Sequence, residues 1–199
     1  MLMKRMINRP LSYELNLNPD HSYLMGRGVP ATLASYFGIG YCNHFLMDDR
    51  IAIPIHDHCG QLVAYAGRWI GTHCPQGKKL YRYTPLFNRS RLLYNLYRVR
   101  DRDTLVLVEG FFSVFRLHTL SIPSVALMGH SLSVTQEELL TESKVKTVVV
   151  MLNGNPSSRK AQRSMVARLA RWFHVRSLEL PQGKEPDTVD EKTLRRAQV

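Results

Sequence analysis

The chain has 199 residues, 44% of them hydrophobic, which is enough to bury the core of one domain and a smaller lobe. No apolar run is long enough to cross a bilayer, and no apolar signal-peptide core follows the N-terminus. Three cysteines without a C-x-x-C pair argue against a disulfide framework or a zinc ribbon. We therefore expect a soluble, cytoplasmic protein with no membrane partner, and the net charge of +11 favours a polyanionic one.

The first half of the chain predicts a mixture of short helices and strands. In chain order we expect an arm over 1–18, a short helix after Pro19, a helix over 31–37, strands over 50–55 and 62–66, a loop over 71–79 and a helix over 90–99. Asp20 is the expected cap of the first helix, and Gly38 ends the second. The helix over 90–99 is expected because its leucines fall on one helical face.

From about Asp101 onward, strands alternate with helices. The expected strands are 104–108, 123–127, 146–152 and 174–180, and the expected helices between them are 112–120, 135–143 and 157–173. This alternation predicts an α/β fold with right-handed crossovers and a parallel sheet. Functional sites in such sheets lie at the C-terminal ends of the strands. Glu109, Asn153 and Asn155 occupy those positions.

The stretch from Arg68 to Arg100 is strongly basic and contains no acidic residue. Its cations are Arg68, Lys78, Lys79, Arg82, Arg89, Arg91, Arg98 and Arg100. Such a segment attracts polyanions, and the aromatic residues among the charges could stack on bases. Two alternatives stay open: the charges form a solvated face without a partner, and most of the aromatic side chains belong to the core.

Several short motifs between residues 19 and 190 carry a family resemblance through their order and spacing. They are Arg27-Gly28, Phe37 to Tyr41, Ile51 to Gly60, Ala66-Gly67-Arg68, Pro85 to Ser90, Val108-Glu109-Gly110, Ala126 to Gly129, and Gly183 to Asp187. Together they resemble the catalytic core of DnaG-type bacterial primases, which contains a TOPRIM domain. The resemblance implies a small mixed α+β basic lobe over 19–100, a TOPRIM-like lobe with a parallel sheet flanked by helices over 101–190, and a C-terminal tail over 191–199.

The resemblance also implies a metal site, from which this sequence departs. In the family a glutamate and two aspartates hold divalent metal for phosphoryl transfer. Glu109 matches the glutamate and Asp187 lies in the closing acidic loop, but Asn153 and Asn155 stand where the family has aspartate, and Ser113 replaces another acid. A charge pair ~4 Å apart is worth about 4 kcal/mol near a surface, so losing two carboxylates weakens Mg²⁺ binding by orders of magnitude.

We therefore expect a degenerate site, with no metal or with Mg²⁺ or Mn²⁺ held weakly by Glu109 and Asp187. Without metal, Glu109 would serve as a cap for the helix that begins near Phe111. Asn153 and Asn155 would then be turn formers, because asparagine tolerates the left-handed conformation and bonds its own backbone.

The family places its template groove along the basic segment, which suggests where phosphates bind. The candidate phosphate contacts are Arg68, Lys79, Arg82, Arg89, Arg91, Arg159 and Lys160. Arg168, Arg171 and Arg176 are not among these candidates, because the solvated face of the helix over 157–173 and its exit accounts for them. The expected ligand is single-stranded DNA or RNA.

Three functions remain open at this stage. The first is a catalytically inactive, primase-like protein that binds nucleic acid as an accessory subunit in DNA replication, defence or mobile-element biology. The second is an active primase-type nucleotidyltransferase, and the third is a basic scaffold for an acidic protein. The chain resembles only the central piece of a primase, so we expect a partner such as a helicase, a polymerase or a zinc-binding module on a separate chain.

Overall fold

The computed structural model describes residues 8–43 and 47–198, which form two compact units. The first unit comprises the residues up to His56 together with residues 61–88, and the second comprises residues 57–60 and the chain from Arg89 onward. The division falls at 88/89, whereas the sequence placed a lobe boundary at 100/101. No helix in the described ranges has the length and apolar character needed to cross a membrane.

The first unit is built on an antiparallel sheet with the strand order β1-β2-β3-β4. Its elements are α1 (Ser22–Gly26), α2 (Ala31–Phe37), β1 (Gly40–Cys42), β2 (Arg50–His56), β3 (Leu62–Trp69) and β4 (Tyr81–Tyr83). The long strands β2 and β3 form the centre of the sheet, and both carry runs of buried residues. The structure confirms the expected mixed α+β lobe.

Local sequence signals explain the two helices of this unit. Helix α2 coincides with the expected 31–37, starting after Pro30 and ending at Gly38, whose φ of 68° is the left-handed conformation that glycine tolerates. The cap of α1 differs from the prediction. His21, and not Asp20, accepts a hydrogen bond at its Nδ1 from the Tyr23 N–H at 3.2 Å.

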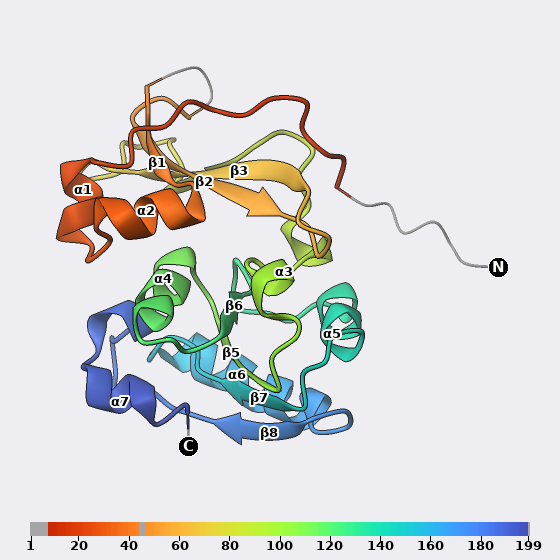
Figure 1. The fold of residues 1–199 in the computed structure, drawn as a ribbon. Coiled ribbons are helices and arrows are strands. Elements are labelled where there is room, and N and C mark those ends of the chain that lie inside the picture. Colours follow the sequence, from red (N-terminus) through yellow and green to blue (C-terminus); the bar gives the residue numbers. More distant parts are fainter. Residues whose placement is uncertain (1–7, 44–46, 199) are drawn as a thin grey trace. The chain divides into compact units, whose positions relative to one another are not determined.

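The second unit contains a parallel sheet with the strand order β6-β5-β7-β8 (Figure 1). Its strands are β5 (Thr104–Val108), β6 (Ser124–Ala126), β7 (Thr147–Val150) and β8 (His174–Ser177). The inner strands β5 and β7 are apolar runs that are buried almost throughout, as expected for a parallel sheet covered on both faces. The predicted α/β fold with a parallel sheet flanked by helices is confirmed.

Helical segments of the second unit precede, connect and follow the strands of this sheet. They are η2 (Arg89–Arg91), α3 (Leu96–Val99), α4 (Phe111–Thr119), α5 (Val134–Thr141), α6 (Pro156–Leu169), η3 (Pro186–Thr188) and α7 (Glu191–Arg195). Of these, α4, α5 and α6 are the connections between strands. Helix α4 packs on β6 and η3, and α6 packs on β7 and β8. Asp190, the last residue of the expected TOPRIM-like lobe, caps α7 by accepting a hydrogen bond from the Thr193 N–H at 2.8 Å. Within the expected tail, Leu194 is fully buried.

The helix expected over 90–99 is wrong for most of its length, since only 96–99 is α-helical. Tyr94 instead forms a bridge with Ala126, and each backbone N–H of the pair donates to the carbonyl of the other at 3.0 and 3.1 Å. Asn95 then takes a left-handed conformation with φ of 71°. The leucines that suggested a helical face are all buried, but Leu92 and Leu93 lie in a non-helical segment that enters the core, and only Leu96 belongs to α3.

Candidate functional site

The C-terminal edge of the parallel sheet brings Glu109 and Asn153 together. Glu109 directly follows β5, and Asn153 lies three residues beyond the end of β7. Because β5 and β7 are neighbouring parallel strands, both ends reach the same edge of the sheet. The backbone N–H of Asn153 donates a hydrogen bond to Oε1 of Glu109 at 2.9 Å. Glu109 therefore braces the turn that follows β7.

Asn155 acts as the N-cap of helix α6. Its side-chain Oδ1 accepts hydrogen bonds from the Ser158 N–H at 2.9 Å and from the Ser157 hydroxyl at 2.7 Å. Pro156 occupies the first helical turn, where its missing N–H costs nothing. The expected structural role of asparagine in this turn is therefore realised for Asn155, although as a helix cap.

Gly154 joins this turn to the loop that carries the acidic segment. Its N–H donates to the Lys184 carbonyl at 2.7 Å, and its carbonyl accepts from the Gly183 N–H at 2.7 Å. A Cβ at position 154 would lie 1.9 Å from the Pro181 carbonyl oxygen, so only glycine allows the two segments to approach this closely.

Asp187, in η3, approaches the buried Ser113 of helix α4. The Ser113 hydroxyl lies 3.5 Å from Oδ1 of Asp187, at the upper limit of a hydrogen bond. A serine hydroxyl carries no charge, so this contact does not replace the carboxylate that the resemblance implies at position 113. The structure thus places Ser113 beside Asp187, and Glu109 beside Asn153.

The donor set on this edge does not fit a two-ion magnesium centre. Magnesium prefers carboxylate oxygens, and the available anionic groups are Glu109 and Asp187, with neutral amides at 153 and 155. The amide oxygen of Asn155 is already engaged in capping α6. Across residues 8–43 and 47–198, no three His, Cys, Asp or Glu side chains gather as a possible metal site.

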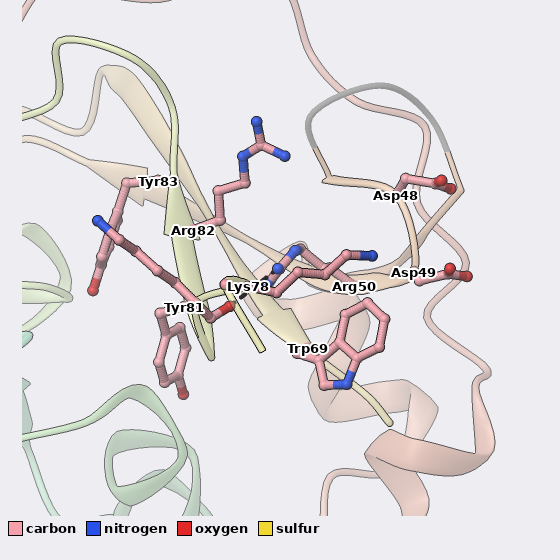
Figure 2. A pocket seen from close by; sticks show the side chains of 10 residues that line it. Asp48, Asp49, Arg50, Trp69, Lys78, Tyr81, Arg82 and Tyr83 are labelled. Atoms are coloured by element: carbon pink, nitrogen blue, oxygen red, sulfur yellow. Dashed lines mark hydrogen bonds between the residues drawn. The ribbon is translucent and has the colours of Figure 1, made fainter. Parts of the chain in front are cut away.

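A pocket of about 690 Å³ lies in the first unit and contains two of the predicted phosphate contacts (Figure 2). Its lining residues are Asp48, Asp49, Arg50, Trp69, Gly77, Lys78, Lys79, Tyr81, Arg82 and Tyr83. Lys79 and Arg82 are exposed. The lining carries four cations and two carboxylates, so the pocket has an excess of positive charge.

Arg50 organises this pocket, and sequence reasoning missed it. Although it is only 4% exposed, its guanidinium donates to the backbone carbonyls of Gly67, Lys79 and Leu80 at 2.9, 3.0 and 3.2 Å. A Cβ at Gly67 would lie 2.7 Å from Cδ of Arg50, so the arginine needs a glycine opposite it. Burial lowers the pKa of Arg50 from its ordinary value. The sequence offered one signal for this role, because Arg50 is a cation at the start of an otherwise apolar strand.

Trp69 places an aromatic ring among the cations of the pocket. The Lys78 Nζ lies 4.7 Å from the ring centroid and the Arg50 guanidinium carbon 5.5 Å from it, both within range of a cation–π contact. The indole N–H donates to the His73 carbonyl at 3.0 Å, which fixes the edge of the ring. Figure 2 shows Trp69 beside Arg50 and Lys78.

Arg68 is less available than the sequence suggested. It is half-buried, its Nε donates to the Tyr23 hydroxyl at 3.1 Å, and its guanidinium lies 5.2 Å from the centroid of the Tyr81 ring. Burial also raises the pKa of Tyr81, so its hydroxyl stays protonated at physiological pH. Arg68 therefore packs between aromatic side chains.

The remaining predicted cations belong to the second unit. Arg89 and Arg91 lie in η2, Lys160 is exposed on α6, and Arg159 is half-buried with one guanidinium N–H donating to the Leu180 carbonyl at 3.2 Å. The seven candidate phosphate contacts are thus divided between the two units.

Two family models match this chain. A family model for the "DNA primase catalytic core, N-terminal domain" matches residues 43–100, and a "Toprim-like" model matches residues 106–190. The DNA primase of Pseudomonas aeruginosa is 28% identical over an alignment that covers 84% of this chain and 32% of that protein.

Solved primase structures resemble this chain in fold. The Aquifex aeolicus primase, with its zinc-binding and RNA polymerase domains, has a TM-score of 0.76 at 25% identity, over 88% of this chain and 54% of that one. A DnaG primase catalytic domain bound to ssDNA has a TM-score of 0.73 at 24% identity, over 88% and 68%. The chain spans between 23% and 32% of the first three curated relatives it matches.

Proposed function

This chain belongs to the DnaG-type primase core family, and from that membership we propose that it binds single-stranded nucleic acid while its own nucleotidyl-transfer site is inactive. The observation that carries the proposal is the donor set at the end of the parallel sheet. The amide of Asn155 caps a helix there, and the carboxylate of Glu109 braces the turn at Asn153.

Inactivity is inferred from charge. Phosphoryl transfer by metal ions requires anionic oxygens that hold the ions near the nucleophile and the leaving group. An amide oxygen supplies only a dipole, so the change from aspartate to asparagine at positions 153 and 155 removes two negative charges from a single turn. Glu109 and Asp187 would then hold an ion weakly at best.

Nucleic-acid binding is inferred from the pocket of the first unit. Its exposed cations Lys79 and Arg82 suit phosphate groups, and Trp69 adds an aromatic ring that suits a base. The solved DnaG catalytic domain bound to ssDNA supports the same class of ligand for this family. The basic character of the whole chain would add a long-range attraction to any polyanion.

The test is a salt titration of binding to fluorescently labelled oligothymidylate and oligouridylate. The double variant Lys79→Gln/Arg82→Gln removes two side-chain charges and leaves the Lys79 carbonyl in place for Arg50. Each lost phosphate contact should reduce the slope of log K against log salt by about 0.7, so binding at 0.1 M salt should weaken about 25-fold.

The matched control removes two lysines that are already paired. Lys144→Gln/Lys146→Gln makes the same change of charge, but these side chains lie 3.1 and 3.3 Å from Asp101 and Asp103 in the second unit. If both double variants lose the same affinity for the oligonucleotide, the loss comes from the change in net charge and not from contacts in the pocket. A salt slope near zero in the native protein would remove the nucleic-acid proposal and favour the acidic-protein partner.

An active primase is the second candidate, because Glu109 and Asp187 both retain their carboxylates. Primer synthesis on a single-stranded template with Mg²⁺ or Mn²⁺ decides between the two. RNA product that disappears in Glu109→Ala would establish activity and refute the proposed inactivity. With no product, we place the protein in the cytoplasm as an accessory subunit that presents nucleic acid to a separate helicase, polymerase or zinc-binding module.

A further inference from the structure

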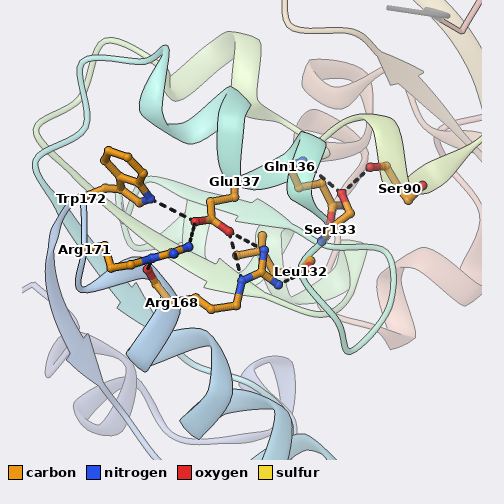
Figure 3. Close-up of polar contacts among 8 residues, drawn as sticks. All are labelled: Ser90, Leu132, Ser133, Gln136, Glu137, Arg168, Arg171 and Trp172. Atoms are coloured by element: carbon orange, nitrogen blue, oxygen red, sulfur yellow. Dashed lines mark hydrogen bonds and ion pairs between the residues drawn. The ribbon is translucent and has the colours of Figure 1, made fainter.

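A buried carboxylate in the second unit holds an exposed tryptophan in a fixed position. Glu137 of helix α5 is only 7% exposed. It accepts hydrogen bonds from the side chains of Arg168, Arg171 and Trp172, at 3.0 Å from the Arg168 Nε, 2.9 Å from the Arg171 Nη2 and 3.0 Å from the indole N–H (Figure 3). Burial alone would raise the pKa of Glu137, but these donors outweigh it and lower the pKa below its ordinary value.

Trp172 is a large aromatic residue that is exposed and yet held in place by a hydrogen bond. Its side chain is 61% exposed, although its indole N–H is anchored on Glu137. The Arg171 guanidinium carbon lies 6.0 Å from the ring centroid, which adds a second restraint. An aromatic ring that is exposed and already immobilised loses little conformational entropy when another flat group stacks on it. The ring therefore has the properties of a stacking platform.

Helix α6 leads a row of cations toward this ring. Between Asn155 and Ser177 the sequence contains no aspartate or glutamate, and its cations are Arg159, Lys160, Arg163, Arg168, Arg171 and Arg176. Lys160, Arg163 and Ala167 follow one another at spacings of three and four residues on one side of α6, and Arg171 lies two residues beyond the end of that helix. All four are exposed, and in the part of the chain that the structure describes no carboxylate pairs with Lys160 or Arg163.

We propose that this row, together with Trp172, is a second binding surface for single-stranded nucleic acid, separate from the pocket of the first unit. Lys160 and Arg163 would contact phosphates, and Trp172 would stack on a base. An acidic protein would use the charges, but a flat ring fixed beside them specifically suits a base.

The fluorescence of Trp172 gives a direct measurement. The chain contains two tryptophans, so Trp69→Phe leaves Trp172 as the single reporter. Titration with oligothymidylate should quench its emission saturably, because the ring stacks on a base. Poly-L-glutamate of equal charge should leave the emission unchanged. An unchanged signal with oligothymidylate, or equal quenching by both polymers, would overturn the proposal, and equal quenching would indicate an acidic protein as the partner.

Charge variants test the phosphate contacts independently. When Lys160→Gln/Arg163→Gln is added to Trp69→Phe, the affinity for oligothymidylate read from the quenching of Trp172 at 0.1 M salt should weaken about 25-fold, and its salt slope should fall by about 1.4. The Glu137 contacts do not involve either residue, so the tryptophan stays anchored. The control Lys144→Gln/Lys146→Gln should bind like the native protein.

The two proposed surfaces can fail separately. If Lys160→Gln/Arg163→Gln binds like its control while Lys79→Gln/Arg82→Gln is weakened, the surface on α6 is refuted and the pocket of the first unit stands. If the reverse holds, the pocket is refuted and the surface on α6 stands.

Discussion

The double variant Asn153→Asp/Asn155→Asp should regain affinity for divalent metal. Position 155 accepts the change without loss of structure, because aspartate caps a helix as well as asparagine does. At position 153 the hydrogen bond to Glu109 comes from the backbone N–H and is independent of the side chain. The variant therefore adds two carboxylates to a turn whose conformation is set by other contacts.

The expected gain follows from Coulomb's law and the cost of dehydration. One carboxylate attracts a divalent ion ~4 Å away with about 8 kcal/mol at a surface-like dielectric, twice the value for a pair of unit charges. Most of this attraction is cancelled, because magnesium gives up its water reluctantly and the new carboxylates repel Glu109. A net gain of about 2–4 kcal/mol corresponds to about 30-fold to 1000-fold tighter binding.

Manganese binding measured by electron paramagnetic resonance gives the affinity directly, since only the free ion contributes the sharp signal. The matched control is Asn16→Asp/Asn18→Asp, which adds the same charges at the same spacing on exposed positions of the first unit. Adding Glu109→Ala to the repaired turn should abolish the gain. If the repaired protein binds manganese no better than the control, the loss of two carboxylates is not what disabled this site.

Three further changes test the scaffold. Glu137→Gln should flatten the pH dependence of the urea midpoint, because the lowered pKa of Glu137 supplies stability above about pH 4.3 that is lost as the pH falls through the folded value; a native-like acid profile would contradict this. Gly154→Ala should cost about 3 kcal/mol in urea unfolding, since its Cβ would overlap the Pro181 carbonyl; a neutral effect would show that the loop moves easily. Ser133→Ala should cost about 1 kcal/mol, because Ser133 and Gln136 form a capping box, and Ser133→Thr should recover most of it in the same assay.

The elements that the sequence predicted well are those with signals in adjacent residues. Helix 31–37 lies between Pro30 and Gly38, and strand 104–108 is an apolar run between Asp103 and Glu109; both match the structure residue for residue. The alternation of such elements also predicted the parallel sheet. These features depend on backbone preferences that act within a few residues.

The prediction of a helix over 90–99 failed because leucines buried in a non-helical segment can have the same spacing as leucines on one face of a helix. What decides between them is the pairing of Tyr94 with Ala126, more than thirty residues away, which spacing within the segment does not reveal. Helix α7 was missed within the expected tail, although Asp190 followed by Thr193 was an available capping signal.

The candidate site also contains features that the sequence predicted and features that it did not. The positions of Glu109, Asn153 and Asn155 at strand ends followed from the alternation of elements. Arg50 and Glu137 were missed, because their partners come from segments distant in sequence and their roles depend on burial. The assigned roles of the metal-site and phosphate-binding residues stay predictions.

The turn at Gly154 and the loop at 181–184 are joined by main-chain atoms, which every amino acid possesses. The main chain therefore sets the conformation of this corner of the molecule, and the neighbouring side chains set its chemical reactivity. The side chain at position 153 can be exchanged for a chemically different one while the corner keeps its form, and position 155 accepts any side chain that caps helix α6. The turn at Gly154 is therefore a suitable position at which to engineer a new reactive centre, provided that the glycine itself is kept.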